Sequence, residues 1–233
     1  MPGHMIPISQ KEKRKEFFAD RQDKALKLCE DADYMPLYMP ALVDLRINAD
    51  GATRIWREWF STPSIRITGR GKSTNISKKE GTTFVVYAHI PNYLSNSKNL
   101  KRVIENHLIF DVGIIPRAEF LRLLDLEDGN NVFVVDYNAI KSSAVGVVTL
   151  KEALKQPQTK PFFGGEKRTE KYFERYKKVY GNRIGVWRPD DLPDRPMARL
   201  LFLGNSYYFS PVDSSCLGDS GRFIGVSSKM APS

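Results

Sequence analysis

Short apolar segments rich in β-branched or aromatic residues recur along the chain, each bounded by Gly, Pro or Asn. This pattern is typical of β-strands. It predicts strands over residues 41–47, 64–68, 83–90, 131–137, 144–149, 183–187, 198–204 and 221–227. The strands are too short and too irregularly spaced for a steady alternation of strand and helix.

Other segments carry apolar positions at helical spacing. In residues 166–180, Tyr172, Tyr176 and Val179 form one apolar stripe, and Gly181 ends the segment. Such a stripe is more often core than a binding platform. The pattern predicts helices over residues 52–60, 98–106, 116–126 and 166–180.

The N-terminal region predicts a long amphipathic helix over residues 10–30, because Ser9 and Glu12 have the spacing of a capping box. Strands and helices together indicate an α+β fold with a mixed, mostly antiparallel sheet and irregularly inserted helices. Residues 1–5 are expected to be a cloning scar, and residues 6–233 are expected to form a single globular domain.

Composition places the chain among ordinary globular proteins, with 41% hydrophobic residues among 233. No run of about 18 apolar residues predicts a membrane span. Cys29 and Cys216 are expected to be free thiols in a reducing, cytoplasmic setting. No metal or cofactor is expected from the spacing of the cysteines and acidic residues.

The net charge of +9 is concentrated in one segment, residues 51–102. This segment contains ten basic residues and only two acidic residues, Glu58 and Glu80, which gives a net charge of +8. The rest of the chain has 26 basic and 25 acidic residues. A block of one sign attracts polyanions. The candidate phosphate contacts are Arg54, Arg57, Arg66, Arg70, Lys72, Lys78, Lys79, Lys98, Lys101 and Arg102.

Residues 68–79 are expected to be a flexible basic loop near aromatic side chains, a combination that suits phosphates and bases. In the plainer alternative, Trp56 and Trp59 belong to the core and the loop is a simple turn. Gly71-Lys72-Ser73 resembles part of a P-loop, but Arg66 stands where the first glycine is needed and no helix follows. No Asp or Glu has a Lys two positions later, which argues against a common nuclease arrangement.

Residues 215–221 include Gly218-Asp219-Ser220-Gly221. This string resembles the nucleophile segment of chymotrypsin-like serine proteases. The resemblance implies a catalytic Ser220 with His89 and Asp136, which follow the family's chain order. The usual second glycine is replaced by Arg222, and the predicted helices fit poorly with an all-β double barrel.

The sequence therefore predicts a nucleic-acid-binding protein with DNA as its partner, in DNA processing or host defence, with metal-independent chemistry as an open question. His89 is the general acid/base candidate for such chemistry. One alternative is a serine hydrolase that uses Ser220, His89 and Asp136. Another is a non-enzymatic protein that docks on an acidic partner. A homodimer is compatible with each alternative.

Overall fold

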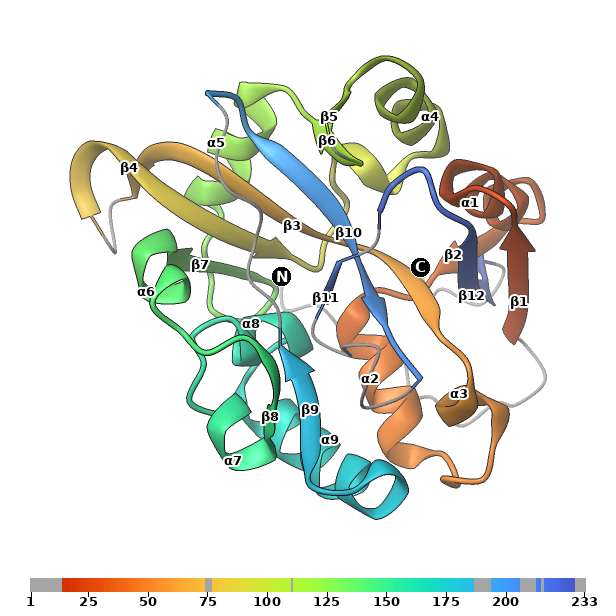
Figure 1. Cartoon of the computed structure of the whole chain (residues 1–233). Coiled ribbons are helices and arrows are strands. Elements are labelled where there is room, and N and C mark those ends of the chain that lie inside the picture. The colour runs from red at the N-terminus through yellow and green to blue at the C-terminus, as the bar shows by residue number, and fades with distance from the viewer. Residues whose placement is uncertain are drawn as a thin grey trace.

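The first and last strands of the described chain pair with each other (Figure 1). The structure is a computed structural model that describes residues 14–73, 77–109, 111–186, 194–205, 213–214 and 216–228. β1 (Arg14–Ala19) pairs antiparallel with β12 (Gly221–Ser227), whose other edge pairs with β2 (Tyr34–Pro36). α1 (Gln22–Asp31) packs against this terminal sheet.

The central sheet has the strand order β5-β6-β10-β3-β4-β7, and all its pairs are antiparallel. The short strand β11 also pairs with β10. The α+β class with an antiparallel sheet is therefore confirmed. The strands are β3 (Phe60–Ser73), β4 (Ser77–Ala88), β5 (Leu108–Ile109), β6 (Val112–Ile114), β7 (Val132–Asp136), β10 (Met197–Leu203) and β11 (Asp213–Ser214).

Helices connect and cover these strands, and a small two-stranded sheet lies beside them. That sheet pairs β8 (Gly146–Thr149) with β9 (Arg183–Val186). The remaining elements are α2 (Met39–Asn48), α3 (Arg54–Arg57), the 3-10 helix η2 (Tyr93–Ser95), α4 (Ser97–Asn106), α5 (Arg117–Asp125), α6 (Tyr137–Lys141), α7 (Leu150–Ala153), α8 (Thr159–Phe163) and α9 (Glu166–Tyr180).

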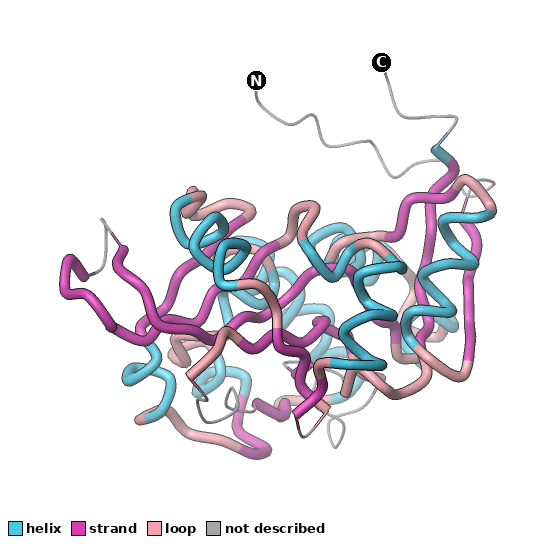
Figure 2. The backbone as a smooth tube through the Cα atoms, turned by 90° about the horizontal axis from the view of Figure 1, so that it is seen from above, coloured by secondary structure: helices cyan, strands magenta, loops and turns pink. Residues whose placement is uncertain are grey.

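Two hydrophobic cores lie on opposite faces of the central sheet, and β4 contributes to both. Phe84 and Val86 pack with α1, α4 and α5, whereas Val85 and Tyr87 pack with α2, α8 and α9. Successive side chains of a strand point to opposite faces, so a central strand covered on both sides needs apolar residues at consecutive positions. The resulting layers of helix, sheet and helix are visible in Figures 1 and 2.

Two sequence predictions about local structure are wrong. In the described part of the predicted helix over residues 10–30, β1 comes first and α1 begins only at Gln22. Pairing with β12 overrides the helical charge pattern, and the Ser9–Glu12 box lies outside the described residues. Residues 41–47 belong to α2 instead of a strand, because helical spacing buries Leu42, Val43 and Arg46 on one face.

Arg46 is fully buried on α2 and joins four parts of the fold. Its guanidinium also donates to the hydroxyl of Tyr172 on α9, 3.1 Å away, and lies 5.5 Å from the centroid of the Trp56 ring. No carboxylate pairs with it among the described residues; backbone oxygens solvate the charge instead. These acceptors are the carbonyl oxygens of Ile55, Glu58, Leu203 and Gly204.

Replacing Arg46 by Met should lower the free energy of unfolding by at least about 3 kcal/mol, because several buried carbonyl oxygens lose their donor at about 1–3 kcal/mol each. Urea denaturation measures this loss. Arg54→Met is the matched control: Arg54 is exposed and its ion pairs with Glu16 and Glu58 should contribute less than about 1 kcal/mol. Equal losses in the two variants would contradict the role assigned to Arg46.

Candidate functional site

Strand β3 presents polar side chains along one face, although it lies in the middle of the central sheet. Ile65 and Ile67 on its opposite face belong to the core with α4 and α5. The polar residues of β3 alternate with these apolar residues and recur at every second position, so they share the other face. This polar stripe consists of Ser64, Arg66, Thr68, Arg70 and Lys72.

Two glycines in the outer half of β3 are explained by helix α5. A Cβ on Gly69 would lie 3.0 Å from three ring carbons of Phe120, and a Cβ on Gly71 would lie 2.8 Å from Leu124. Gly71 therefore gives α5 room to pack, which accounts for the partial P-loop likeness. The expected flexible loop over residues 68–79 is wrong for the described residues, because they belong to β3 and β4. The strict alternation from Ser64 to Lys72 was the signal that could have revealed it.

Exposure increases along the polar stripe from one end to the other. Ser64 is fully buried, Arg66 and Thr68 are 6% and 5% exposed, and Arg70 and Lys72 are exposed. Within the described part of the chain, the side chains of Arg70 and Lys72 have no ion-pair or hydrogen-bond partner. The outer end of the stripe is therefore the part available to a ligand.

The neighbouring strands extend the polar surface. Thr83 on β4 lies directly opposite Arg70, and Arg199 on β10 lies directly opposite Arg66. Arg199 is partly exposed and donates to the carbonyl oxygen of Asp111. Directly opposite side chains in an antiparallel pair point to the same face. Arg66 and Arg199 therefore place two cations side by side.

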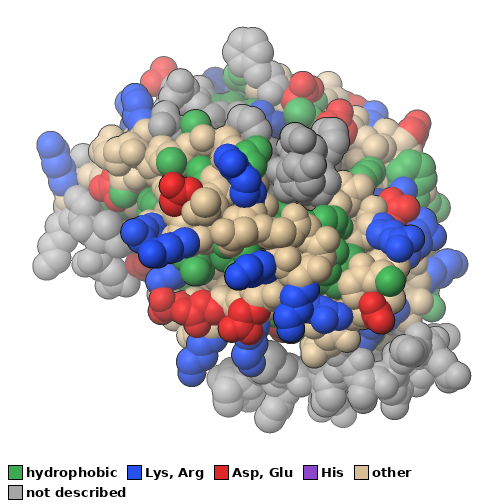
Figure 3. Space-filling view, turned by 60° about the horizontal axis from the view of Figure 1, so that its bottom comes forward, with side chains coloured by type: hydrophobic (Ala, Val, Ile, Leu, Met, Phe, Trp, Pro, Cys, Tyr) green, Lys and Arg blue, Asp and Glu red, His purple; other side chains and the backbone are tan. Residues whose placement is uncertain are grey.

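The other predicted basic contacts are distributed over separate surfaces. Arg54 pairs with Glu16 and Glu58 near the terminal sheet, and Arg57 is exposed on α3. Lys79 is exposed on β4, where the side chain of Lys78 lies outside the described set. On the face in Figure 3, Lys and Arg are interspersed with Asp and Glu. The basic residues of this segment whose side chains are described thus lie on several elements: α3, β3, β4 and α4.

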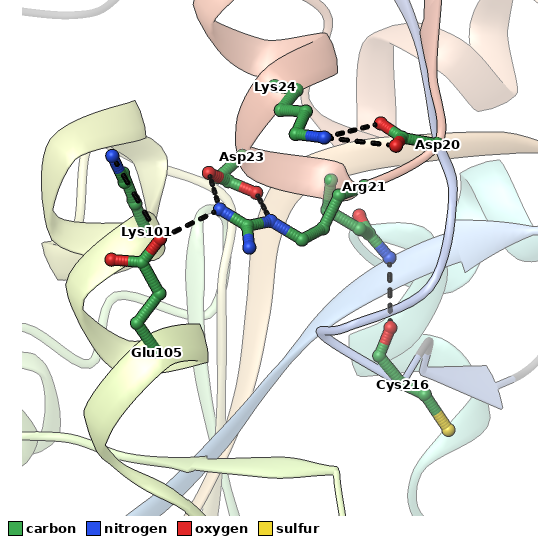
Figure 4. A network of polar contacts seen from close by, with 8 residues as sticks. Asp20, Arg21, Asp23, Lys24, Lys101, Glu105 and Cys216 are labelled. Carbon is green, nitrogen blue, oxygen red and sulfur yellow. Dashed lines mark hydrogen bonds and ion pairs between the residues drawn. The ribbon is translucent and has the colours of Figure 1, made fainter.

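Helix α4 carries Lys98, Lys101 and Arg102, all exposed. Lys101 lies 3.9 Å from Glu105, which also accepts from Arg21 (Figure 4). Arg21 in turn pairs with Asp23 at 2.6 Å. These contacts tie the start of α1 to α4. The contact of Lys101 itself is with a carboxylate of its own helix.

His89, at the end of β4, is buried and has partners on both ring nitrogens. Nδ1 lies 3.0 Å from Ser64 Oγ and Nε2 lies 2.8 Å from the carbonyl oxygen of Pro161. Because Ser64 Oγ also accepts from the Met39 amide, its hydroxyl hydrogen can be donated to Nδ1. This arrangement fits a neutral ring with the proton on Nε2. Burial lowers the pKa of His89 to about 4.

The residues of the serine-hydrolase alternative are not brought together. Asp136 pairs with Phe84, five residues before His89 on β4, a separation of about 16 Å along the strand. Its carboxylate accepts from the Asn138 amide at the start of α6. Ser220 precedes β12 in the terminal sheet, next to Gly221.

A shallow groove of about 440 Å³ lies between β1 and the end of α1. Phe18 and Leu28 line it and are 53% and 48% exposed. The guanidinium of Arg222 lies 5.2 Å from the Phe18 ring centroid and 5.4 Å from that of Trp59. It also contacts Glu58 at 2.7 Å, so Phe18 takes part in an internal cation–π cluster. The polar stripe is the better ligand surface.

Three further features of the described residues concern metal binding, membrane spans and the cysteines. No group of three or more His, Cys, Asp or Glu is placed there to hold a metal ion. None of the helices in that part of the chain combines the length and apolarity that a bilayer span requires. Both cysteines are free thiols, as expected.

Comparison with known proteins defines the fold class. No protein-family model matches the chain, and no curated protein matches it. A solved structure described as "Accommodation of massive sequence variation in Nanoarchaeota by the C-type lectin fold" superposes with a TM-score of 0.82. The match covers 93% of this chain and 99% of that chain, with 43% sequence identity. The fold is therefore a C-type lectin fold, and the chain belongs to the family of this nanoarchaeal protein.

Family membership corrects the function expected from sequence. The prediction of nucleic-acid binding with DNA as partner is wrong, and so is the serine hydrolase alternative, because the chain belongs to the family of a protein with a C-type lectin fold. The third alternative, a non-enzymatic protein that docks on an acidic partner, is set aside together with these two. The charge block of residues 51–102 was misleading because a count along the sequence does not show which side chains share a surface.

His89 should make the protein less stable in acid. Its pKa is about 4 in the fold and about 6.5 in the unfolded chain, so between these values only the unfolded chain binds the proton. The stabilisation is complete above about pH 6.5 and is lost as the pH falls toward 4, by at most about 3 kcal/mol. Urea unfolding from pH 7.5 to 4.5 should show this slope, and His89→Gln should flatten it. An unchanged slope would refute the neutral, buried His89.

Gly221→Ala should destabilise the fold strongly, by about 2–4 kcal/mol, because its Cβ would lie 2.7 Å from the Gln22 backbone and 2.9 Å from the Ala25 Cβ. Gly218→Ala is the control: the nearest atoms to its Cβ are 4.0 Å away. Thermal unfolding compares the two variants. If Gly218→Ala proves equally damaging, close packing does not explain the Gly-Asp-Ser-Gly string.

Proposed function

We propose that the protein is a lectin-like, non-catalytic recognition protein that binds a glycan through the exposed end of the polar stripe. The observation that carries this proposal is the 43% identity, over nearly the whole of both chains, to a protein of C-type lectin fold. That protein is described as one whose fold accommodates massive sequence variation. Such tolerance is valuable for recognition, because surface residues can change with the ligand while the fold stays the same.

The cores of this chain support the same division between frame and surface. Helices cover both faces of the central sheet, and the buried residues of β4 serve both cores. Arg70, Lys72 and Thr83 belong to neither core. Substitutions at these positions would therefore change a binding surface without changing the packing that holds the strands.

The polar stripe also has the rigidity that recognition needs. Arg70 and Lys72 lie on the part of β3 that pairs with β4 alone, beyond the end of its pairing with β10, and α5 packs closely against Gly69 and Gly71. Side chains on a fixed backbone lose less conformational entropy on binding than side chains on a mobile loop. The guanidinium, ammonium and Thr83 hydroxyl groups supply donors for sugar oxygens.

The proposal is tested by screening the protein on a broad panel of immobilised glycans and titrating the best binder by calorimetry. Arg70→Ala/Lys72→Ala should weaken that binding at least about 10-fold, the equivalent of about 1.4 kcal/mol. Lys171→Ala/Lys178→Ala is the matched control, since it removes two exposed charges from α9. It should bind like the wild type, and thermal unfolding should be unchanged in both.

Two results would contradict the proposal. Failure to bind any glycan would remove the lectin-like function. Glycan binding that is equally strong in Arg70→Ala/Lys72→Ala would place the site elsewhere on the surface.

A further inference from the structure

Adjacent central strands β3 and β10 carry only positive charge. Their residues, Phe60–Ser73 and Met197–Leu203, include no Asp or Glu. Their cations are Arg66, Arg70, Lys72 and Arg199. Many exposed cations of the described residues are paired, as Lys24 is with Asp20 and Lys27 with Asp31, whereas Arg70 and Lys72 have no such partner there. Neither of these two strands therefore supplies a carboxylate to the cations beside it.

The register of the strands concentrates these charges. Arg66 lies directly opposite Arg199, and Arg70 follows Arg66 by four positions on the same face. Like charges placed directly opposite each other oppose strand pairing. Arg66 and Arg199 each have other partners, which for Arg199 include the carbonyl oxygen of Asp111. At the exposed end of the stripe, Arg70 and Lys72 have no partner among the described residues, and their charges favour an anion there.

The exposed end offers donors in a defined arrangement. Arg70 and Lys72 are two positions apart on one strand face, about 7 Å along the strand. Thr83 stands beside Arg70 on β4. A guanidinium binds a carboxylate or a sulfate through two parallel hydrogen bonds, whereas an ammonium and a hydroxyl suit single sugar oxygens.

We infer that the glycan bound at this surface carries an anionic group, a carboxylate or a sulfate, held by Arg70. Lys72 and Thr83 contact neighbouring oxygens of the same sugar. This inference rests on the proposed function, since it names the ligand class of the same site. Neutral glycans of the same backbone bind more weakly because they leave the two cations without a counter-charge.

The test uses one oligosaccharide, N-acetyllactosamine, in three forms: neutral, carboxylated by a terminal sialic acid, and sulfated. Binding of the full chain to each form is measured by calorimetry at 50 mM and 300 mM NaCl. The variant Arg70→Gln/Lys72→Gln removes both charges but keeps hydrogen-bonding side chains of similar reach. Lys171→Gln/Lys178→Gln has the same net charge and is altered only on α9.

At least one anionic form should bind about 10-fold tighter than the neutral form in 50 mM NaCl, and this preference should shrink in 300 mM NaCl because salt screens exposed charges. Arg70→Gln/Lys72→Gln should abolish the preference, and the α9 control should keep it. The carboxylated and sulfated arms identify which anion is recognised.

Other outcomes separate the inference from the function. Equal binding of all three forms would overturn the anionic ligand and leave a glycan-binding protein. An anionic preference that survives in Arg70→Gln/Lys72→Gln would overturn the assignment to this surface. If no form binds and the broad glycan panel is also silent, the lectin-like function falls together with the inference.

Discussion

The hydrogen bonds of the buried Arg46 guanidinium are the interaction on which the arrangement of α2, α3, the end of β10 and α9 depends. It brings the end of α2, the segment from α3 into β3, the end of β10 and helix α9 to one point. A charge in a hydrophobic core is costly unless hydrogen bonds replace its hydration. Here backbone oxygens do so, and their positions are thereby fixed relative to one another. The core that supports β3 from below is organised around this group.

Strand β3 runs from this core to an end where Arg70 and Lys72 are exposed. Ser64 is tied to Met39 and His89, which holds β3 against α2 and α8. Further along, Gly69 and Gly71 let α5 press against one face while Arg70 and Lys72 occupy the other. A rigid support and a free surface are thus separated by a single strand. Substitution of Arg70 or Lys72 would therefore leave the packing of α5 against β3 unchanged.

The sequence was informative where local pattern and tertiary environment agree. The aromatic stripe of α9 is a true core face, with Tyr172 and Tyr176 buried, and Trp56 is core as the plainer alternative held. Prediction failed where distant pairing decides structure: β1 depends on β12, and α2 depends on the burial of Arg46. Gly69 and Gly71 suggested a loop because the helix that requires them lies about 50 residues further along. The candidate site could not be predicted for the same reason, because only the strand register shows which cations are neighbours.

The pairing of β1 with β12 has a kinetic consequence. Arg14 lies opposite Val226, so this contact closes a chain of about 210 residues. During synthesis, β1 emerges before β12, and its hydrogen bonds to β12 can form only after β12 has been made. Until then, Phe17, buried in the finished sheet, has no β12 to pack against. Contacts this distant in sequence slow folding, so completion of the terminal sheet should be a late event, and the nascent chain benefits from any factor that shields β1 in the interval.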